Sequence, residues 1–376
     1  MIRIGIFGGA FNPVHDGHVK AAIAAAEQLK LDKLIIVPSF ISPHKNVTPA
    51  KGQHRINMLK IAFGGMKNIE ISDYEILNGG KSYSYITAEH FKKEYPSAQL
   101  YMLVGADMLN DFFTWKNPEI ILQNCKIAAF GREGYFCDYE DIKDKFQNRF
   151  STDFLTVSFK GEDISSTEIR TYCTFGFSPA GVNPEVFKYI KENDVYFADE
   201  YVNYVKKVLP EKRLLHTANV VVCAEKKTKE LGLDAEKVRI AATLHDCAKY
   251  QDVKDYGGFS LPSDVPPPVV HAFLGAYIAE TVLGIKDKEI LDAIKYHTSG
   301  KAEMSILAKL IFVADMLEKG RDYSEVYALR ALYERDFELC FKECLKEEVK
   351  HLINGGKYIY KETLSAYDYY VTGEKI

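Results

Sequence analysis

The sequence predicts two fold classes in one chain: an α/β fold with a doubly wound parallel sheet, followed by an all-α helical bundle. In the first half, short apolar runs alternate with amphipathic segments, a pattern typical of β-α units. After about residue 199 the strand signals fade, and long segments with a period of about 3.6 residues replace them. A length of 376 residues also suits two domains. We place the boundary near residues 197–199, which gives domains at 1–197 and 198–376.

The first half contains six short apolar runs that read as strands. An alanine-rich helix over Gly17–Lys30 follows the first of them, and helical segments separate most of the others. This alternation predicts a Rossmann-like parallel sheet covered on both faces, with ligands beyond the carboxyl ends of the strands. The strands are expected at Ile2–Phe7, Leu34–Val37, Ile69–Ile71, Leu100–Val104, Ile127–Phe130 and Leu155–Val157.

The second half is predicted to be helical throughout. Pro262 and the prolines at 266–268 mark a loop between two of its helices. The final stretch, 325–376, is rich in charge and tyrosine and indicates helical packing. Helices are expected at Arg213–Leu231, Asp234–Ala248, Val270–Leu283, Lys288–His297 and Glu303–Glu318, followed by a charged helix to about residue 352.

Composition excludes several function classes. The 48 basic and 52 acidic residues nearly balance, so we expect neither a nucleic-acid nor a membrane partner. No apolar run reaches the ~18 residues of a membrane helix, and the strand pattern at Met1–Phe7 argues against a signal peptide. Seven scattered cysteines without a CxxC pair predict reduced thiols and a cytoplasmic location. A homo-oligomer is possible, and the sequence does not decide the oligomeric state.

The first candidate site follows the first strand, in the string GGAFNPVHDGH over residues 8–18. Gly8 and Gly9 let the backbone turn sharply and approach a phosphate closely. His18 falls in the first turn of the next helix, where the helix dipole favours anions, and His15 just precedes it. Two imidazoles here could donate hydrogen bonds to phosphate oxygens. The same residues also fit a tight turn with surface histidines, or a metal-binding pair.

This string resembles the HxGH signature of the nucleotidyltransferase superfamily and, more closely, the bacterial nicotinate-nucleotide adenylyltransferases. The resemblance covers residues 1–197. Two positions depart from the family pattern, since Ala10 stands where Ser or Thr is usual and Ser84 replaces a Thr. The other matching segments are Ser42–Lys45 (the PHK loop), Arg55–Leu59, Ser82–Thr87, Gly105–Asp107, Trp115, Ile164–Arg170 (ISSTxIR) and Val186–Ile190.

The resemblance implies transfer of AMP from ATP to nicotinate mononucleotide, with Mg²⁺, giving deamido-NAD and pyrophosphate. The catalytic residues it implies are His15, His18, Lys45 and Arg170. The substrate-binding residues it implies are Gly8, Gly9, Phe11, Ser84, Thr87, Gly105, Asp107, Trp115, Ile164, Ser165, Ser166 and Thr167. Several of them also fit structural roles, because hydroxyl and carboxylate residues cap helices and tryptophan fills cores. Nicotinamide mononucleotide or phosphopantetheine remain alternative acceptors.

The second candidate site collects histidines and aspartates from several predicted helices. Asp315 interrupts an apolar run, and a buried carboxylate is costly unless it is paired or bound to a metal. Imidazoles with carboxylates suit Fe, Mn, Zn or Co, and ligands from separate helices suit a bundle core. Taken singly, each residue also fits a core histidine or a capping aspartate. The candidate ligands are His216, His245, Asp246, His271, His297 and Asp315.

These residues resemble the H…HD…D pattern of HD-domain phosphohydrolases, and most closely the YqeK-type symmetrical diadenosine tetraphosphate hydrolases. The resemblance covers about residues 200–325 and includes Gly275, Gly300 and Glu318. It implies a site for two metal ions, often iron, held by the six residues above. It also implies that Lys249 is catalytic and that Arg213 and Arg321 bind the polyphosphate of the substrate. The alternative is a module that senses a nucleotide without turnover.

Overall fold

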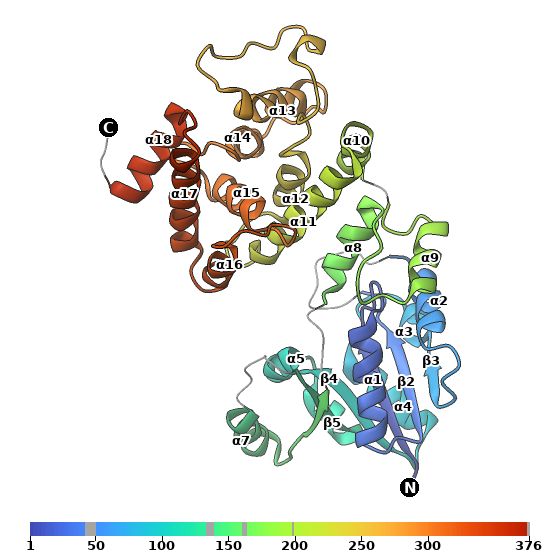
Figure 1. The fold of residues 1–376 in the computed structure, drawn as a ribbon. Coiled ribbons are helices and arrows are strands. Elements are labelled where there is room, and N and C mark those ends of the chain that lie inside the picture. The colour runs from blue at the N-terminus through green and yellow to red at the C-terminus, as the bar shows by residue number, and fades with distance from the viewer. Residues whose placement is uncertain (42–49, 133–138, 160–163, 198, 374–376) are drawn as a thin grey trace. The chain divides into compact units, whose positions relative to one another are not determined.

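The computed structural model describes residues 1–376 except 42–49, 133–138, 160–163, 198 and 374–376, and except the side chains of Asp107 and Arg132 (Figure 1). The chain divides into two compact units, Met1–Phe197 and Ala198–Ile376. Each unit is described by itself below, as unit 1 and unit 2.

Unit 1 is built on a six-stranded sheet whose strands all run parallel, in the order β3-β2-β1-β4-β5-β6. All six predicted strands are present. The order reverses between β1 and β4, and this is where a doubly wound sheet leaves room for a ligand. The strands are β1 (Arg3–Gly9), β2 (Lys33–Pro38), β3 (Ile69–Ile71), β4 (Gln99–Gly105), β5 (Cys125–Arg132) and β6 (Leu155–Phe159).

Helices cover both faces of this sheet (Figure 1). Ile4 and Ile6 of β1 belong to one apolar core and Phe7 belongs to the other, because successive side chains of a strand point to opposite faces. The predicted α/β class is therefore confirmed. The helices are α1 (Asp16–Gln28), α2 (Gly52–Ala62), α3 (Tyr74–Asn78), α4 (Ser84–Glu94), α5 (Ala106–Asp111), α6 (Pro118–Asn124), α7 (Tyr139–Phe150), α8 (Ser166–Phe175) and α9 (Pro184–Glu192), with a 3-10 turn at Phe112–Thr114.

Unit 2 is a helical bundle, as predicted. Its central helix α15 is apolar on nearly all sides and buried, as expected of a helix surrounded by others. The helices are α10 (Glu200–Val208), α11 (Glu211–Lys227), α12 (Ala235–Leu244), α13 (Val270–Thr281), α14 (Lys288–Tyr296), α15 (Ile306–Leu317), α16 (Val326–Arg335), α17 (Phe337–Asn354) and α18 (Lys361–Tyr367), with 3-10 turns at Val253–Asp255 and Pro267–Val269 and a π-turn at Asp368–Thr372.

Unit 2 departs from the predicted helices in three main respects. Helix α12 ends at Leu244, so that His245 and Asp246 lie in the turn that follows it. The expected charged helix is two helices, because Asp336 leaves the helical conformation and its side chain accepts a hydrogen bond from Leu339 N. Helix α10 was not predicted. Within the described residues, no helix is long and apolar enough to cross a membrane.

Candidate active sites

The carboxyl ends of β1 and β4 form one wall of a cavity of about 210 Å³, which we call the sheet cavity. It lies at the switch point of the sheet, where the order of strands reverses. Six of the residues predicted to bind substrate line it, although they come from four separate segments of the chain. They are Gly8, Gly9, Ser84, Thr87, Gly105 and Trp115.

Residues 8–18, from the end of β1 into the first turn of α1, are called the glycine turn below. Its two histidines lie against each other at the start of α1. His15 is the residue before the helix, and the centroids of the His15 and His18 rings are 3.8 Å apart. The Nδ1 atom of His18 accepts a hydrogen bond from His15 N at 3.3 Å, which leaves the Nε2 atom of His18 to carry the proton. A Cβ atom at Gly17 would lie 3.0 Å from Nδ1 of His15. Glycine at 17 therefore permits this close packing of the imidazole.

The N-terminus of α8 contacts the same turn. Ser165 caps the helix by accepting a hydrogen bond from Glu168 N at 3.1 Å. The hydroxyl of Ser166 donates to Pro13 O at 3.2 Å, and Nη1 of Arg170 donates to Asn12 O at 2.9 Å. Nη2 of Arg170 also donates to the hydroxyl of Thr167. The structure thus brings a helix N-terminus and a guanidinium beside the histidine pair, although about 150 residues separate them in the sequence.

Arg55 holds the turn from the other side, a role that the sequence did not indicate. Its side chain is 1% exposed. Its guanidinium donates to Ala10 O at 2.9 Å, to Ser39 O at 2.5 Å and to Ala50 O at 2.9 Å. Because these carbonyls belong to the ends of β1 and β2 and to the segment before α2, Arg55 joins three loops at the edge of the sheet.

Glu75 is a second residue of the sheet cavity that sequence reasoning missed. It lines the cavity and accepts a hydrogen bond from the hydroxyl of Thr87 at 2.5 Å. Burial raises the pKa of its carboxyl, against the opposing effect of its hydrogen bonds from Thr87 and Ser82. Nothing in the local sequence sets Glu75 apart from the other acidic residues of the chain.

Four further predicted site residues of unit 1 lie neither in the lining of the sheet cavity nor among the histidine and α8 residues described above, or cannot be placed. Phe11 is buried beneath the turn, where it packs on Phe7 and on His18. Ile164 packs on the core of unit 1. Lys45 lies outside the described residues, as does the side chain of Asp107.

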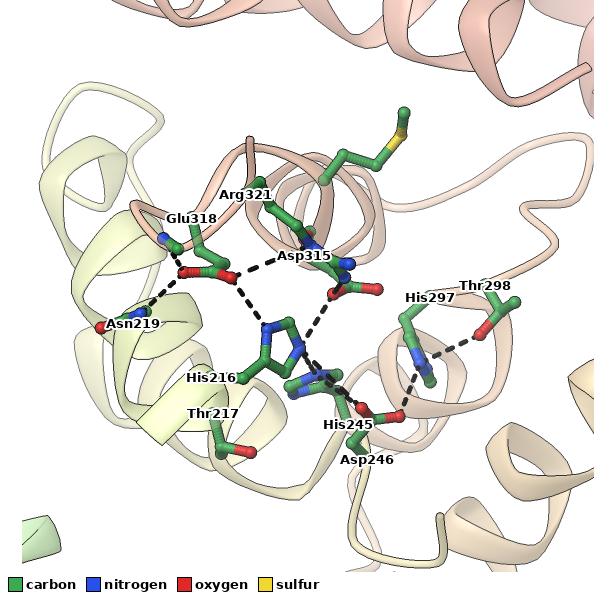
Figure 2. A network of polar contacts seen from close by, with 12 residues as sticks. His216, Thr217, Asn219, His245, Asp246, His297, Thr298, Asp315, Glu318 and Arg321 are labelled. Atoms are coloured by element: carbon green, nitrogen blue, oxygen red, sulfur yellow. Dashed lines mark hydrogen bonds and ion pairs between the residues drawn. The ribbon is translucent and has the colours of Figure 1, made fainter. Parts of the chain in front are cut away.

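The six candidate metal ligands of unit 2 converge on one point from several segments of the chain. All of them except His271 are labelled in Figure 2. His216 comes from α11, and His245 and Asp246 come from the turn after α12. His271 comes from α13, His297 follows α14 and Asp315 comes from α15. The ligand atoms form three overlapping groups in which all atoms lie within 4.8 Å of one another: His216, His245 and Asp246; His245, His297 and Asp315; and Asp246, His271 and His297.

Asp246 faces one pair of histidines, His216 and His245, with one oxygen and a second pair, His271 and His297, with the other. It is 2% exposed. Its Oδ2 atom faces Nε2 of His245 at 3.6 Å and Nε2 of His216 at 3.8 Å. Its Oδ1 atom faces Nε2 of His271 at 3.1 Å and Nε2 of His297 at 3.5 Å. One carboxylate therefore presents an oxygen to each pair of histidines.

In three of the four histidines, the Nδ1 atom is held by a protein oxygen, so that Nε2 is the atom that faces the cluster. Nδ1 of His245 lies 2.7 Å from Ala242 O, and Nδ1 of His297 lies 2.8 Å from Ile294 O. Nδ1 of His216 instead lies 3.0 Å from the carboxylate of Glu318. Support of this kind is typical of histidines that bind metals.

The donor set fits divalent transition metals. Imidazole nitrogens and carboxylate oxygens are their preferred ligands. The buried Oδ1 atom of Asp246 accepts no well-directed hydrogen bond from the described residues, despite the short distance to His271. A buried oxygen left in this state is costly unless a cation satisfies it.

The charge states of three groups of the cluster also suit metal binding. Burial lowers the pKa of His245 to about 3 and lowers the pKa of His271, which keeps both imidazoles neutral. Burial by itself would raise the pKa of Asp246, but His245, His271 and His297 hold that pKa well below its usual range. Neutral imidazoles and ionised carboxylates are the forms that coordinate metals.

The three predicted cations of unit 2 border the cluster. Nη1 of Arg213 lies 2.8 Å from Oδ2 of Asp246, and Nη2 of Arg321 lies 2.5 Å from Oδ1 of Asp315. Nζ of Lys249 lies 3.1 Å from Nε2 of His271. All three positive charges therefore lie within reach of an anion bound at the cluster.

Comparison with known proteins gives two family matches. Residues 6–172 match the cytidylyltransferase-like family, and residues 213–320 match the HD domain family. A 1.50 Å crystal structure of a "predicted HD superfamily hydrolase involved in NAD metabolism" from Clostridium acetobutylicum is 29% identical. It covers 47% of this chain and 97% of its own, with a TM-score of 0.42.

Two relatives match both halves of the chain together. A protein of Mycoplasma genitalium is 30% identical over 324 residues, which is 85% of this chain and 88% of the relative. A protein of Mycoplasma pneumoniae is 29% identical over 351 residues, 91% of this chain and 97% of the relative. Both are named probable nicotinate-nucleotide adenylyltransferase/Ap4A hydrolase. The chain, with its glycine turn and its histidine–aspartate cluster, thus belongs to the family of nicotinate-nucleotide adenylyltransferase/Ap4A hydrolases.

Proposed function

We propose that unit 1 transfers AMP from ATP to nicotinate mononucleotide and that unit 2 hydrolyses diadenosine tetraphosphate (Ap4A) or a related nucleotide polyphosphate. The names of the two Mycoplasma relatives and the two family matches support both halves of this proposal. The partners it implies are small nucleotides. The six described cysteines are free, which agrees with action in the cytoplasm.

In unit 1 the reaction needs positioning and neutralisation of charge. A 5′-phosphate oxygen of the mononucleotide attacks the α-phosphorus of ATP, the bond from that phosphorus to the β-bridging oxygen breaks, and pyrophosphate leaves. His15, His18 and Arg170 would stabilise the charge on the transferring phosphoryl group. The free amides at the start of α8, with Ser165, Ser166 and Thr167, would hold the outer phosphates, and Mg²⁺ would accompany the ATP.

The observation that carries this assignment is the contact of α8 with the glycine turn through Ser166 and Arg170. It joins a helix N-terminus and a guanidinium to the turn that carries the two imidazoles, and Gly8 and Gly9 at the start of this turn line the sheet cavity together with Trp115. The acceptor is tested by letting nicotinate and nicotinamide mononucleotide compete for limiting protein with ATP. We expect deamido-NAD and pyrophosphate to form in equal amounts. If nicotinamide mononucleotide reacts in preference, it is the acceptor in place of nicotinate mononucleotide.

In unit 2 the six clustered side chains would hold two divalent ions, with iron as the first candidate. Such ions supply Lewis acidity and a water of lowered pKa. Arg213, Lys249 and Arg321 would bind the polyphosphate, because each lies beside a ligand of the cluster. In the symmetrical reaction a water oxygen bonds to one of the two central phosphorus atoms. The bond from that phosphorus to the central bridging oxygen breaks, and two ADP molecules and two protons are released.

The observation that carries the second assignment is Asp246, which presents one oxygen to each pair of histidines. The test is hydrolysis of Ap4A by protein loaded with iron or manganese, compared with protein stripped by a chelator. We expect ADP from the loaded protein only. If the loaded protein binds Ap4A and leaves it intact, unit 2 is a sensing module instead of an enzyme.

The two activities have a chemical link. An adenylyl-transferring site that accepts ATP in place of the mononucleotide would make Ap4A, and unit 2 would remove it. This link predicts that protein with Asp246→Asn, prepared with iron or manganese and incubated with ATP and Mg²⁺ but no mononucleotide, accumulates Ap4A while the parent protein prepared in the same way does not. Equal amounts from both proteins would disprove the link and leave each separate activity standing.

A further inference from the structure

Two cavities adjoin the metal-ligand cluster of unit 2, and they share no lining residue. One has a volume of about 420 Å³ and meets the cluster at His297 and Asp315; we call it the α17 cavity. The other has a volume of about 410 Å³ and meets the cluster at His271; we call it the α13 cavity. Two spaces of nearly equal volume therefore open from different sides of one reaction centre.

The α17 cavity has the features of a nucleoside site. Arg321 lies at its inner end beside Asp315, where a phosphate would pass from the cluster into the cavity. Phe312, Met316 and Tyr323 give it apolar surface, and Glu348 adds a carboxylate. Small-molecule sites typically combine apolar walls with a few polar groups of this kind.

Glu348 is the carboxylate of this cavity that is open to a ligand. Glu347 and Glu325 both lie near Lys350, at 3.1 and 3.6 Å. Glu348 is half-buried, and its carboxylate forms no hydrogen bond or ion pair with another described residue. Burial raises the pKa of its carboxyl. A polar group without a partner at the side of an active cavity is suited to bind a hydroxyl or amino group of a substrate.

The α13 cavity repeats this pattern with different residues. Lys249 lies at its inner end, with Nζ 3.1 Å from Nε2 of His271. Its walls are apolar and come from Pro267, Val270 and Leu274, and the amide of Gln251 adds a polar group. Each cavity thus has one cation next to the cluster and an apolar surface beyond it.

We propose that the two cavities bind the two nucleoside diphosphate halves of one dinucleoside tetraphosphate, one half in each cavity. This inference rests on the proposed function of unit 2 and explains why the tetraphosphate would be cleaved symmetrically. When both nucleosides are seated, two phosphates extend inward from each side, and the central P–O–P bridge lies at the metal-ligand cluster. Water then adds to a central phosphorus, the central bridge breaks, and each cavity retains one ADP.

The test is the number of ADP molecules bound per metal-loaded chain, measured by equilibrium dialysis. Unit 1 also binds nucleotides, so the count is taken as the difference between the parent protein and the variant Asp246→Ala in the same buffer. We expect a difference of two. Gln251→Trp, which fills the α13 cavity, and Asn354→Trp, which fills the α17 cavity, should each remove one ADP without loss of metal.

Matched controls separate blocked cavities from damaged folds. Tyr250→Trp is the neighbour of Gln251, and Lys342→Trp lies on α17 like Asn354; both positions are exposed and line neither cavity. Both controls should bind two ADP. Glu348→Gln should raise the KM for Ap4A about tenfold with little change in kcat, as expected for a lost charged hydrogen bond. Glu343→Gln, on the same helix but outside the cavity, should leave the KM unchanged.

The inference and the proposed function can fail separately. A parent protein that cleaves Ap4A but shows a difference of one ADP, or blocked variants that still bind both ADP molecules, would overturn the inference and leave the function standing. A parent protein that shows a difference of two ADP but does not cleave Ap4A would overturn the function and retain the two binding positions.

Discussion

At the residue scale, the support of His216 differs from that of the other histidines in the metal cluster. Glu318 contacts Nδ1 of His216 with one carboxylate oxygen, and its other oxygen accepts hydrogen bonds from Asn219 Nδ2 at 2.8 Å and from Gly320 N. A glutamine cannot satisfy all three groups, because one end of its amide is a donor. Glu318 should therefore set both the orientation and the basicity of His216.

We predict that Glu318→Gln weakens metal binding at the His216 side of the cluster about 10- to 100-fold, the usual effect of losing such a partner. The measurement is metal content after dialysis against a series of free-metal concentrations. Retention of both ions by Glu318→Gln at limiting metal would contradict this role.

Arg55 shows how a residue of a recognised motif can act on structure alone. Its guanidinium satisfies carbonyls of three loops and is almost fully buried. We predict that Arg55→Met lowers the free energy of unfolding of unit 1 by about 3 kcal/mol, since several buried acceptors lose their donor. Lys60→Met, at an exposed position of α2, should change it by less than about 0.5 kcal/mol. Denaturant unfolding monitored on unit 1 would decide, and equal stability of both variants would refute the assignment.

Glu75 gives unit 1 a pH dependence whose sign can be worked out. Burial raises its pKa in the folded protein above the ordinary value of 4.5. The stability it contributes is therefore complete below pH 4.5 and is lost as the pH rises through the raised pKa. We predict that Glu75→Gln becomes more stable relative to the parent as the pH increases from 4.5 to 7. Unfolding curves across this range that show a constant difference would contradict a raised pKa.

At the element scale, the sequence located the strands better than it located some helix ends. Each strand is a short apolar run between polar residues, and the buried parallel sheet keeps those runs distinct. The ends of α12 and the break at Asp336 depend on tertiary contacts and on one capping side chain, which the helical period does not reveal. Helix α10 has only nine residues, which is shorter than the stretch over which a helical period can be recognised.

The glycine turn allows activity and helix stability to be separated in one substitution. Gly17 lies in the first turn of α1, and a Cβ atom there would crowd the His15 ring at 3.0 Å. Alanine favours a helix over glycine by about 1 kcal/mol. We predict that Gly17→Ala keeps or raises the melting temperature of unit 1 while lowering its kcat for adenylyl transfer at least about tenfold. Unchanged kcat would show that the position of the His15 ring is not critical.

At the scale of the whole molecule, the sequence predicted both candidate sites because their residues lie in recognisable local strings. The convergence of α8 on the glycine turn, and of five segments of unit 2 on Asp246, follows from tertiary folding. For the same reason the sequence did not predict the structural role of Arg55 or the positions of Glu75 and Glu348 in their cavities. A charged residue in a helical stretch looks exposed until its neighbours are known. Two compact units, each with a candidate site of its own, indicate two reactions that share one chain.

The most direct test of this account is a pair of assays on the intact protein and two of its variants. Deamido-NAD formation is measured from ATP and nicotinate mononucleotide, and ADP release is measured from Ap4A with metal-loaded protein. The account predicts that His18→Ala loses the first activity and keeps the second, and that Asp246→Asn does the reverse. It would be contradicted if either variant kept the activity it should lose, or if one substitution abolished both activities in a folded protein.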